Sequence, residues 1–154
     1  MTKVMITGAG GFIGSHLTEK LLEDGCNVYA FDIKPLNECI NLKDIKDHSR
    51  LHYFQGDIRN KKDIINFFQK DVDLIYHLAS IVGVRYYMQD PLALIDIIIN
   101  GTKNIINLCM ENNTKLLFAS TSEIYGKNNN VPWSENSDRV LGDPSIDRWS
   151  YSSS

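Results

Sequence analysis

The chain has 154 residues, of which 43% are hydrophobic, and this length is enough for about one domain with a sizeable core. Its net charge of −3 and its scattered Lys and Arg residues exclude a nucleic-acid-binding surface built from a basic stretch. The apolar runs between residues 94 and 99 are interrupted by Asp96, and the first residues resemble a strand rather than a signal peptide. We therefore expect a cytoplasmic protein with neither a nucleic acid nor a membrane as a partner.

The three cysteines, Cys26, Cys39 and Cys109, are widely spaced. They form no C-x-x-C pair and have no histidine at the spacing of a metal ligand. This pattern favours buried thiols of a reduced protein over a zinc site or disulfides. We expect no metal site.

Taken in order, the chain alternates apolar strands with amphipathic helices. The expected strands are 3–6, 27–32, 51–55, 73–78 and 115–120, and the expected helices are 11–24, 62–69 and 90–112. Residues 34–50 are expected to be a loop with a short helix. Gly25 is a helix stop, and Asp90 followed by Pro91 is an N-cap and first helical residue. Strands and helices in this order predict an α/β fold, with a doubly wound parallel sheet of five strands covered on both faces.

The long helix 90–112 has an apolar stripe of Leu94, Ile98, Ile105 and Leu108. A stripe at this spacing is first explained as the face that packs on the core. A weaker alternative is that the helix is a surface for a structural partner.

Residues 5–17 read MITGAGGFIGSHL, so the first strand runs through a glycine-rich turn into the first helix. A pyrophosphate can contact N–H groups at a helix N-terminus only where no side chain holds it away, and a tight turn favours residues that tolerate positive φ. Glycine meets both demands. The spacing Gly8-x-x-Gly11-x-x-Gly14 differs from the G-x-G-x-x-G of the commonest dinucleotide fold, and an ordinary strand-to-helix turn is the alternative.

Asp32 ends the second strand, 18 residues after Gly14. A carboxylate at this place can accept hydrogen bonds from both hydroxyls of the adenosine ribose, and its charge repels a 2′-phosphate. The glycine turn and Asp32 together predict NAD as the cofactor in preference to NADP. Lys34 is the one nearby group that would tolerate a phosphate.

In a parallel sheet the ligand crevice lies beyond the carboxyl ends of the strands. Polar, small and acidic residues gather at these ends, in 8–14, at Asp32 and in 56–58, 77–80 and 120–123. Each has a structural alternative: Asp57 could cap the next helix, and residues 120–123 could be a turn. His77 is flanked by apolar residues, so a structural role in the core is favoured for it.

Together these residues resemble the extended short-chain dehydrogenase/reductases, and more closely their NAD-dependent nucleotide-sugar epimerase/dehydratase family. The resemblance rests on TGAGGFIG at 7–14, Asp32, GDIR at 56–59, HLAS at 77–80, NGT at 100–102, STSEIYG at 120–126 and Tyr151. It implies a Rossmann domain that holds NAD tightly, and a UDP-sugar substrate bound mainly by a smaller C-terminal domain. It also implies a homodimer for the complete protein.

The resemblance assigns roles to individual positions. The implied cofactor-binding residues are Gly8, Gly11, Phe12, Ile13 and Gly14 for the pyrophosphate, Asp32 for the ribose, Asp57 and Ile58 for the adenine, and Leu78, Ala79, Ser80 and Asn100 along the cofactor. The implied catalytic residues are Thr121, Ser122, Glu123 and Tyr151.

The implied mechanism is a transient oxidation of the sugar at C4. Tyr151 would take the proton of the 4-hydroxyl and Thr121 would orient the oxygen, while a nearby lysine lowers the tyrosine pKa. The alternatives for the two residues are a surface aromatic and a cap at a strand end. The family motif is Tyr-x-x-x-Lys, whose lysine would be residue 155.

Because residues 1–154 lack that lysine, we expect them alone to be close to inactive. We expect a partial NAD-binding Rossmann domain without the substrate domain. The alternative to an enzyme is a non-catalytic NAD-binding module.

The resemblance predicts a UDP-glucose 4-epimerase-like reaction, and the alternatives are decarboxylation of UDP-glucuronate and 4,6-dehydration of a nucleotide sugar. The run 121–123 resembles the decarboxylases and some dehydratases. The segments 81–86, 138–142 and 148–151 resemble instead a bacterial subgroup of epimerase-type proteins.

Overall fold

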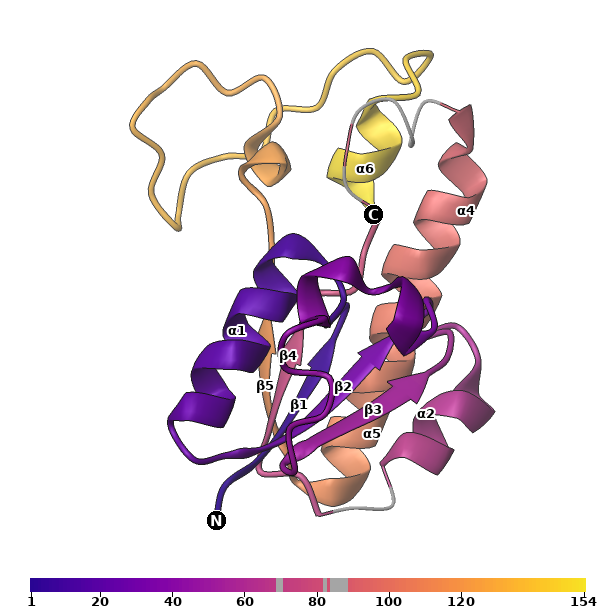
Figure 1. Cartoon of the computed structure of the whole chain (residues 1–154). Coiled ribbons are helices and arrows are strands. Elements are labelled where there is room, and N and C mark those ends of the chain that lie inside the picture. The colour runs from indigo at the N-terminus through magenta and orange to yellow at the C-terminus, as the bar shows by residue number, and fades with distance from the viewer. Residues whose placement is uncertain (69–70, 82, 84–88) are drawn as a thin grey trace. The chain divides into compact units, whose positions relative to one another are not determined.

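The computed structural model describes residues 1–68, 71–81, 83 and 89–154. Its five strands are β1 (Lys3–Thr7), β2 (Asn27–Asp32), β3 (Leu51–Gln55), β4 (Leu74–His77) and β5 (Lys115–Phe118). They form one sheet in the order β3-β2-β1-β4-β5, and every neighbouring pair is parallel (Figure 1). The predicted doubly wound parallel sheet is confirmed, with the ends of β2 and β3 where the sequence places them.

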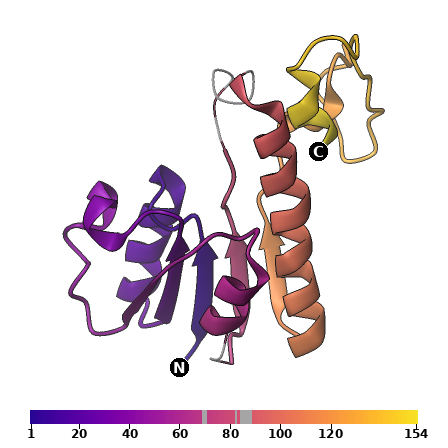
Figure 2. The ribbon, with the colours of Figure 1, turned by 90° about the vertical axis from the view of Figure 1, so that its right-hand side faces the viewer.

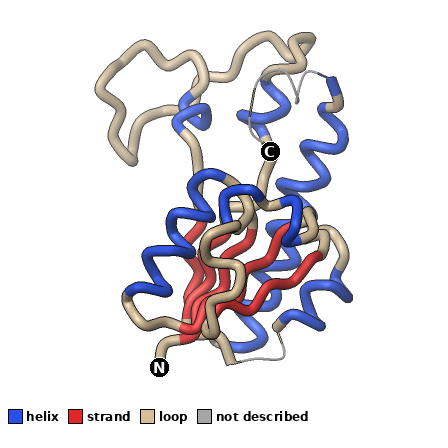
Figure 3. Tube along the Cα trace, viewed as in Figure 1, coloured by secondary structure: helices blue, strands red, loops and turns tan. Residues whose placement is uncertain are grey.

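Helices and tight helical turns connect these strands (Figure 3). Among the described residues, the α-helices are α1 (Phe12–Glu23), α2 (Lys61–Phe67), α4 (Pro91–Asp96), α5 (Thr102–Asn112) and α6 (Trp149–Ser153). The 3-10 turns are η1 (Leu36–Glu38), η2 (Ile40–Leu42) and η4 (Ser122–Tyr125), and η3 (Ile97–Gly101) is π-helical.

The chain divides into two compact units, residues 1–79 with 100–119 and residues 80–99 with 120–154. In the first unit α1 packs on β1 and β2, while α5 packs on β5 and α2 from the other side of the sheet (Figure 2). The strand order reverses between β1 and β4. In sheets of this kind the ligand crevice lies at that reversal, beyond the carboxyl ends of the strands.

Alternation along β2 builds the core of the first unit on both faces of the sheet. Val28 and Ala30 pack with Leu22 of α1, whereas Phe31 stacks edge-on against Phe67 of α2 at 5.3 Å between ring centroids. All five of these residues are at most 2% exposed. The sheet of the first unit is therefore well buried on both faces.

The predicted helix 90–112 is present, but its middle turn is π-helical. The Asp90 side chain accepts a hydrogen bond from the Ala93 N–H at 2.9 Å, and Pro91 is the first helical residue, as predicted. Of the apolar stripe, Leu94, Ile105 and Leu108 are buried, while Ile98 is half-buried.

This 22-residue helix is long and apolar enough to cross a membrane by length and composition alone. Such a match is weak evidence, since core helices pass the same test. Its second half packs on β5 and α2, where Ile105 and Leu108 are buried.

Some expected boundaries are wrong. The segment between β2 and β3 contains two 3-10 turns in place of one short helix, and β5 ends at Phe118 rather than at Ser120. The helix expected over 62–69 ends at Phe67, with residue 69 outside the described residues. The segment 81–86 is described only at Ile81 and Gly83. All three cysteines are free; Cys39 and Cys109 are buried as predicted, and Cys26 is half-buried.

Candidate functional site

The glycine turn joins β1 to α1 through close backbone contacts. The N–H groups of Gly8 and Ala9 donate to the carbonyl of Phe31 in β2, at 2.8 and 3.2 Å. Gly8 has a φ of +74°, a value that favours glycine. A Cβ on Gly14 would lie 2.2 Å from the Gly8 carbonyl oxygen, so the first turn of α1 packs directly on the glycine turn.

The N-terminus of α1 follows the carboxyl end of β1 and has no side-chain cap. Its N-cap is Gly11, which offers no side chain to accept from the N–H groups of the first turn. The Phe12 and Ile13 side chains are 75% and 68% exposed. Uncapped N–H groups and the positive end of the helix dipole make this terminus suited to an anion such as a pyrophosphate.

Asp32 at the end of β2 is tied to the glycine turn. Its carboxylate accepts hydrogen bonds from the N–H groups of Gly10 (2.9 Å) and Lys34 (3.1 Å), and the residue is 9% exposed. A carboxylate has about four lone-pair directions, so two remain for other donors. The predicted ribose-binding residue therefore also holds the turn that would bind the pyrophosphate.

Three residues that sequence reasoning missed hold the segment after Asp32. Tyr53 of β3 donates to the Lys34 carbonyl at 2.5 Å and lies 3.1 Å from the Cys39 thiol. Cys39 in turn lies so close to Gly10 that a Cβ there would be 2.5 Å from its sulfur. Burial raises the pKa of Tyr53 and of the Cys39 thiol, so both remain protonated near neutral pH. Asn41 adds a long contact from its side-chain amide to the Gly10 carbonyl at 3.4 Å.

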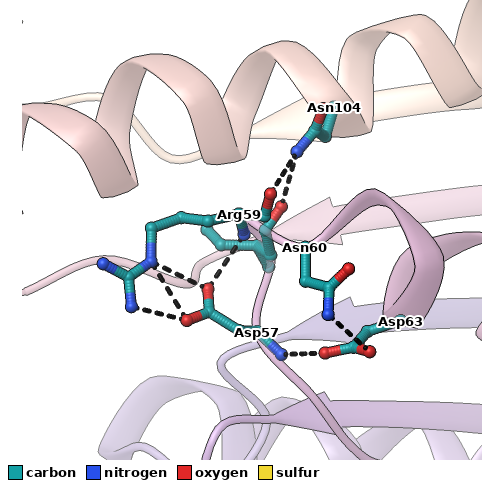
Figure 4. Close-up of polar contacts among 6 residues, drawn as sticks. Asp57, Arg59, Asn60, Asp63 and Asn104 are labelled. Carbon is teal, nitrogen blue, oxygen red and sulfur yellow. Dashed lines mark hydrogen bonds and ion pairs between the residues drawn. The ribbon is translucent and has the colours of Figure 1, made fainter.

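The predicted adenine-binding residues Asp57 and Ile58 follow β3. The Arg59 guanidinium donates to the Asp57 carboxylate, with the shortest contact at 2.6 Å, and these hydrogen bonds lower the pKa of Asp57 (Figure 4). Asn104 of α5 donates to the Ile58 carbonyl at 3.0 Å. The alternative that Asp57 caps α2 is wrong, because the N-cap is Asn60, whose side chain accepts from the Lys62 N–H.

Ile58 lies close to the end of the π-helical turn that contains Asn100. A Cβ on Gly101, at the end of η3, would lie 2.5 Å from the Ile58 side chain, so the helix approaches this residue closely. Asn100 itself is exposed and lies within the same turn. π-Helical turns inside α-helices are frequent at functional sites.

Leu78 and Ala79 form the turn after β4 and contact the end of β1. Their N–H groups donate to the Thr7 hydroxyl oxygen, each at 3.2 Å. His77, just before them, is 2% exposed and lies between Thr7 and Thr102, which fits the structural role favoured for it. Ser80, the next residue, belongs to the second unit and is exposed.

The second unit brings the predicted catalytic residues together. Thr121 is the N-cap of η4, and its hydroxyl accepts a hydrogen bond from the Glu123 N–H at 3.2 Å. Thr121 therefore has the capping role that was the structural alternative for it. Ser122 and Glu123 lie in η4, which packs against α6, the helix that carries Tyr151.

Side chains of α6 and the residue before it hold Glu123. Nη2 of Arg148 donates to both Glu123 carboxylate oxygens, at 2.9 and 3.1 Å. The Ser152 hydroxyl donates to the Glu123 carbonyl at 2.7 Å, and Arg139 donates to the Ser152 carbonyl. The Glu123 backbone and carboxylate are thereby both held in place within η4.

A cavity of about 530 Å³ lies at the opposite ends of the strands in the first unit. It is lined by residues that include Phe68, Leu74 and Thr114, at the amino ends of β4 and β5. None of the predicted site residues lines it.

The strand order, the glycine turn and the acidic end of β2 define a Rossmann-type domain. A family model described as GDP-mannose 4,6 dehydratase matches residues 5–154. The chain therefore belongs to the NAD-dependent nucleotide-sugar epimerase/dehydratase family of extended short-chain dehydrogenase/reductases, as its motifs predict.

Individual relatives agree with this assignment. The UDP-N-acetyl-alpha-D-glucosaminuronate decarboxylase of Bacillus cytotoxicus is 36% identical over 97% of this chain and 45% of its own length. The PbgP3 protein from Burkholderia pseudomallei has 29% identity and a TM-score of 0.86 over 99% of this chain and 45% of its own. The dTDP-glucose 4,6-dehydratase of Bacillus anthracis, crystallised with NAD, has 25% identity and a TM-score of 0.74 over 99% and 46%. The chain thus spans less than half the length of these relatives.

Proposed function

We propose that this chain binds NAD at the glycine turn and that the full-length protein converts a UDP-sugar through a 4-keto stage. Among the reactions of the family, we propose decarboxylation of a UDP-linked uronic acid. The observation that carries the choice of decarboxylation over epimerisation is the carboxylate of Glu123, a residue of η4, which is held by Arg148.

The residues of the first unit fit the cofactor. Gly8 and Gly11 leave the N-terminus of α1 open to the pyrophosphate, and the two remaining lone-pair directions of Asp32 suit the two ribose hydroxyls. When bound, NAD would supply the acceptor for the hydride from C4 of the sugar. The Bacillus anthracis dehydratase with NAD supports this choice of cofactor.

The residues of the second unit fit the proton transfers. Tyr151 is proposed to take the proton of the 4-hydroxyl, and the Thr121 hydroxyl to orient that oxygen. In a 4-keto uronic acid the C5–C6 bond can break, because the carbonyl accepts the electron pair as CO2 leaves. C5 then needs a proton, and Glu123 is proposed to deliver it.

A 4-epimerase makes no demand on a carboxylate at position 123, because it only oxidises, turns and reduces the sugar. The fixed position of Glu123 therefore favours decarboxylation over epimerisation. The relative from Bacillus cytotoxicus, whose name gives a UDP-linked glucosaminuronate as its substrate, supports the same choice.

The test is to incubate the full-length protein with UDP-glucuronate and with UDP-N-acetylglucosaminuronate, then measure CO2 release and identify the sugar by proton NMR. We expect CO2 release that Glu123→Gln abolishes. Glu135→Gln, at an exposed glutamate of the same unit, should leave it unchanged. Epimerised sugar without CO2 would show a 4-epimerase instead, and NAD binding without any turnover would show a non-catalytic module.

We also propose that the full-length protein is a cytoplasmic homodimer. Light scattering at micromolar concentration tests the dimer, and a monomer mass would exclude it.

A further inference from the structure

A closed ring of contacts surrounds the Asp32 carboxylate and is built from three separate stretches of the first unit. The N–H groups of Gly10 and Lys34 donate to its two oxygens, at 2.9 Å to Oδ2 and 3.1 Å to Oδ1. The Tyr53 hydroxyl of β3 donates to the Lys34 carbonyl at 2.5 Å. Cys39 closes the ring, since its sulfur lies 3.1 Å from the Tyr53 oxygen and next to Gly10.

The direction of each hydrogen bond in the ring follows from what its partners can offer. A backbone carbonyl only accepts, so the single proton of the Tyr53 hydroxyl goes to Lys34. Toward Cys39 the Tyr53 oxygen can then only accept, and the thiol is the donor. Burial raises the pKa of the Tyr53 hydroxyl and that of the Cys39 thiol, so both protons are present near neutral pH. Cys39 is 3% exposed, and its N–H donates to the Leu36 carbonyl at 3.1 Å, which fixes it at the end of η1.

The backbone that follows Asp32 is held by side chains of β3. The N–H of Lys34 is bound by Asp32 and its carbonyl by Tyr53, so Lys34 is fixed on both sides. The Gln55 side chain donates to the preceding carbonyl, that of Ile33, at 3.3 Å. Tyr53 and Gln55 are two positions apart on a strand, so they share one face of β3 and bind successive carbonyls. The segment therefore cannot shift without breaking contacts with β3.

This ring opposes the rearrangement that a 2′-phosphate would need. A phosphate monoester carries a charge of about −1.5 to −2 near neutral pH, so beside Asp32 it needs the carboxylate to turn away. Turning would break the hydrogen bonds from Gly10 and Lys34, and Tyr53 keeps the Lys34 backbone from moving aside. On the other side the space is filled, because a Cβ on Gly10 would lie 2.5 Å from the Cys39 sulfur. The carboxylate therefore stays where it repels the phosphate.

We infer that Tyr53 and Cys39 are positioning residues that set the preference of this site for NAD over NADP. They act through Lys34 and Gly10, which keep the Asp32 carboxylate in one orientation. Asp32 supplies the charge that repels a 2′-phosphate, and the ring supplies the rigidity that prevents the charge from moving away. This inference rests on the proposed binding of NAD at the glycine turn.

The test compares Tyr53→Phe with wild type in the full-length protein, with the Kd for NAD measured by calorimetry and the Kd for NADP by competition with NAD. Phenylalanine keeps the ring and removes the hydroxyl, so the Lys34 carbonyl loses its donor and the Cys39 thiol its acceptor. We expect the ratio of the Kd for NADP to the Kd for NAD to fall about fivefold, which corresponds to the loss of one neutral hydrogen bond. A general loss of stability would weaken the binding of both cofactors alike and leave this ratio unchanged.

Two variants of Cys39 test its part in the ring. Cys39→Ala removes the donor to Tyr53 and opens the space next to Gly10, so the ratio should fall, but by less than in Tyr53→Phe. Cys39→Ser keeps a donor of similar size and should have a ratio close to that of wild type. Tyr29→Phe is the matched control, because it removes the hydroxyl of a buried tyrosine in β2 and keeps the ring. It should leave the ratio unchanged.

The outcomes distinguish this inference from the proposed function. A wild-type protein that binds no NAD overturns the proposed function and, with it, the role of the ring. A wild-type protein that binds NAD, beside a folded Tyr53→Phe variant with the same ratio, overturns the positioning role alone. An equal fall of the ratio in Tyr29→Phe does the same. If Tyr53→Phe does not fold, Cys39→Ala decides, and an unchanged ratio in that variant overturns the role.

Discussion

The two units of this chain hold their site residues by different means. In the first, Gly8 and Asp32 are fixed by backbone hydrogen bonds and by contacts inside a buried sheet. In the second, Glu123 is fixed by side chains close to the surface, such as Arg148. Among the described residues of the second unit, the buried ones are Leu94, Asn128 and Ser152, and two of these are polar.

Because of this difference, substitutions at the two sites should affect the stability of the fold to different degrees. Substitutions at the first unit's site should disturb the core that supports it, because the same contacts serve both. Exposed ion pairs contribute little to stability, so substitutions at the second unit's site should move a side chain without unfolding the protein. The following predictions test this contrast.

The largest effect is expected for Gly14→Ala. Its Cβ would lie 2.2 Å from the Gly8 carbonyl oxygen and 2.8 Å from the Ala9 Cα, so either the turn or α1 must shift. We expect the free energy of unfolding, measured with urea, to fall by roughly 2–3 kcal/mol. Gly11→Ala is the control, because its Cβ would meet only the Gly8 oxygen at 3.2 Å. Equal losses in the two variants would contradict this explanation.

The next effect is a dependence of stability on pH that comes from His77. Its pKa is lowered by burial to about 4 in the folded state, against 6.5 when unfolded. Above pH 6.5 both states are neutral at this residue. Between pH 6.5 and pH 4 only the unfolded state takes up the proton. The free energy of unfolding therefore decreases as the pH is lowered, by at most about 1.4 kcal/mol per pH unit. Below 4 both states are protonated.

The check is chemical denaturation at pH 6.5 and pH 5 for wild type and His77→Asn. Wild type should lose up to about 2 kcal/mol more than the variant over this range. Identical pH slopes would show that His77 is not the residue responsible.

Local sequence patterns predicted those features of the fold that depend on neighbouring residues, such as strand ends and helix caps. The ends of β2 and β3 follow from apolar runs, and the cap at Asp90 follows from the Asp-Pro pair. The glycine turn and Asp32 could be predicted because the same residue types are required by the backbone geometry of the turn and by the ligand.

The remaining features depend on contacts between distant residues. Nothing near Ile97–Gly101 in sequence signals a π-helical turn, since the close approach of Gly101 to Ile58 exists only after folding. The contact of Tyr53 with Cys39 spans 14 positions. The Arg148–Glu123 pair spans 25, and no spacing rule connects two such positions in a loop-rich region.

A tenfold effect on cofactor affinity is expected for Asp32→Asn. The amide keeps one oxygen to accept from the Gly10 or the Lys34 N–H but loses the charge. We expect the Kd for NAD to rise about tenfold, which corresponds to the loss of one charged hydrogen bond. The preference for NAD over NADP should become smaller. Asp24→Asn, which removes a surface partner of Lys20, should change neither. An unchanged Kd in Asp32→Asn would exclude Asp32 from the cofactor site.

The smallest effect on stability is expected for Arg148→Met. The Arg148 and Glu123 side chains are 48% and 31% exposed, so their pair should contribute less than about 1 kcal/mol to the free energy of unfolding. The amide NMR signals of Ser122 and Glu123 should shift nevertheless, because the Glu123 carboxylate loses its partner. Lys20→Met, which breaks an exposed pair on α1, is the control and should leave those signals in place. A loss above about 2 kcal/mol would mean that the second unit, like the first, builds its site from the contacts that keep it folded.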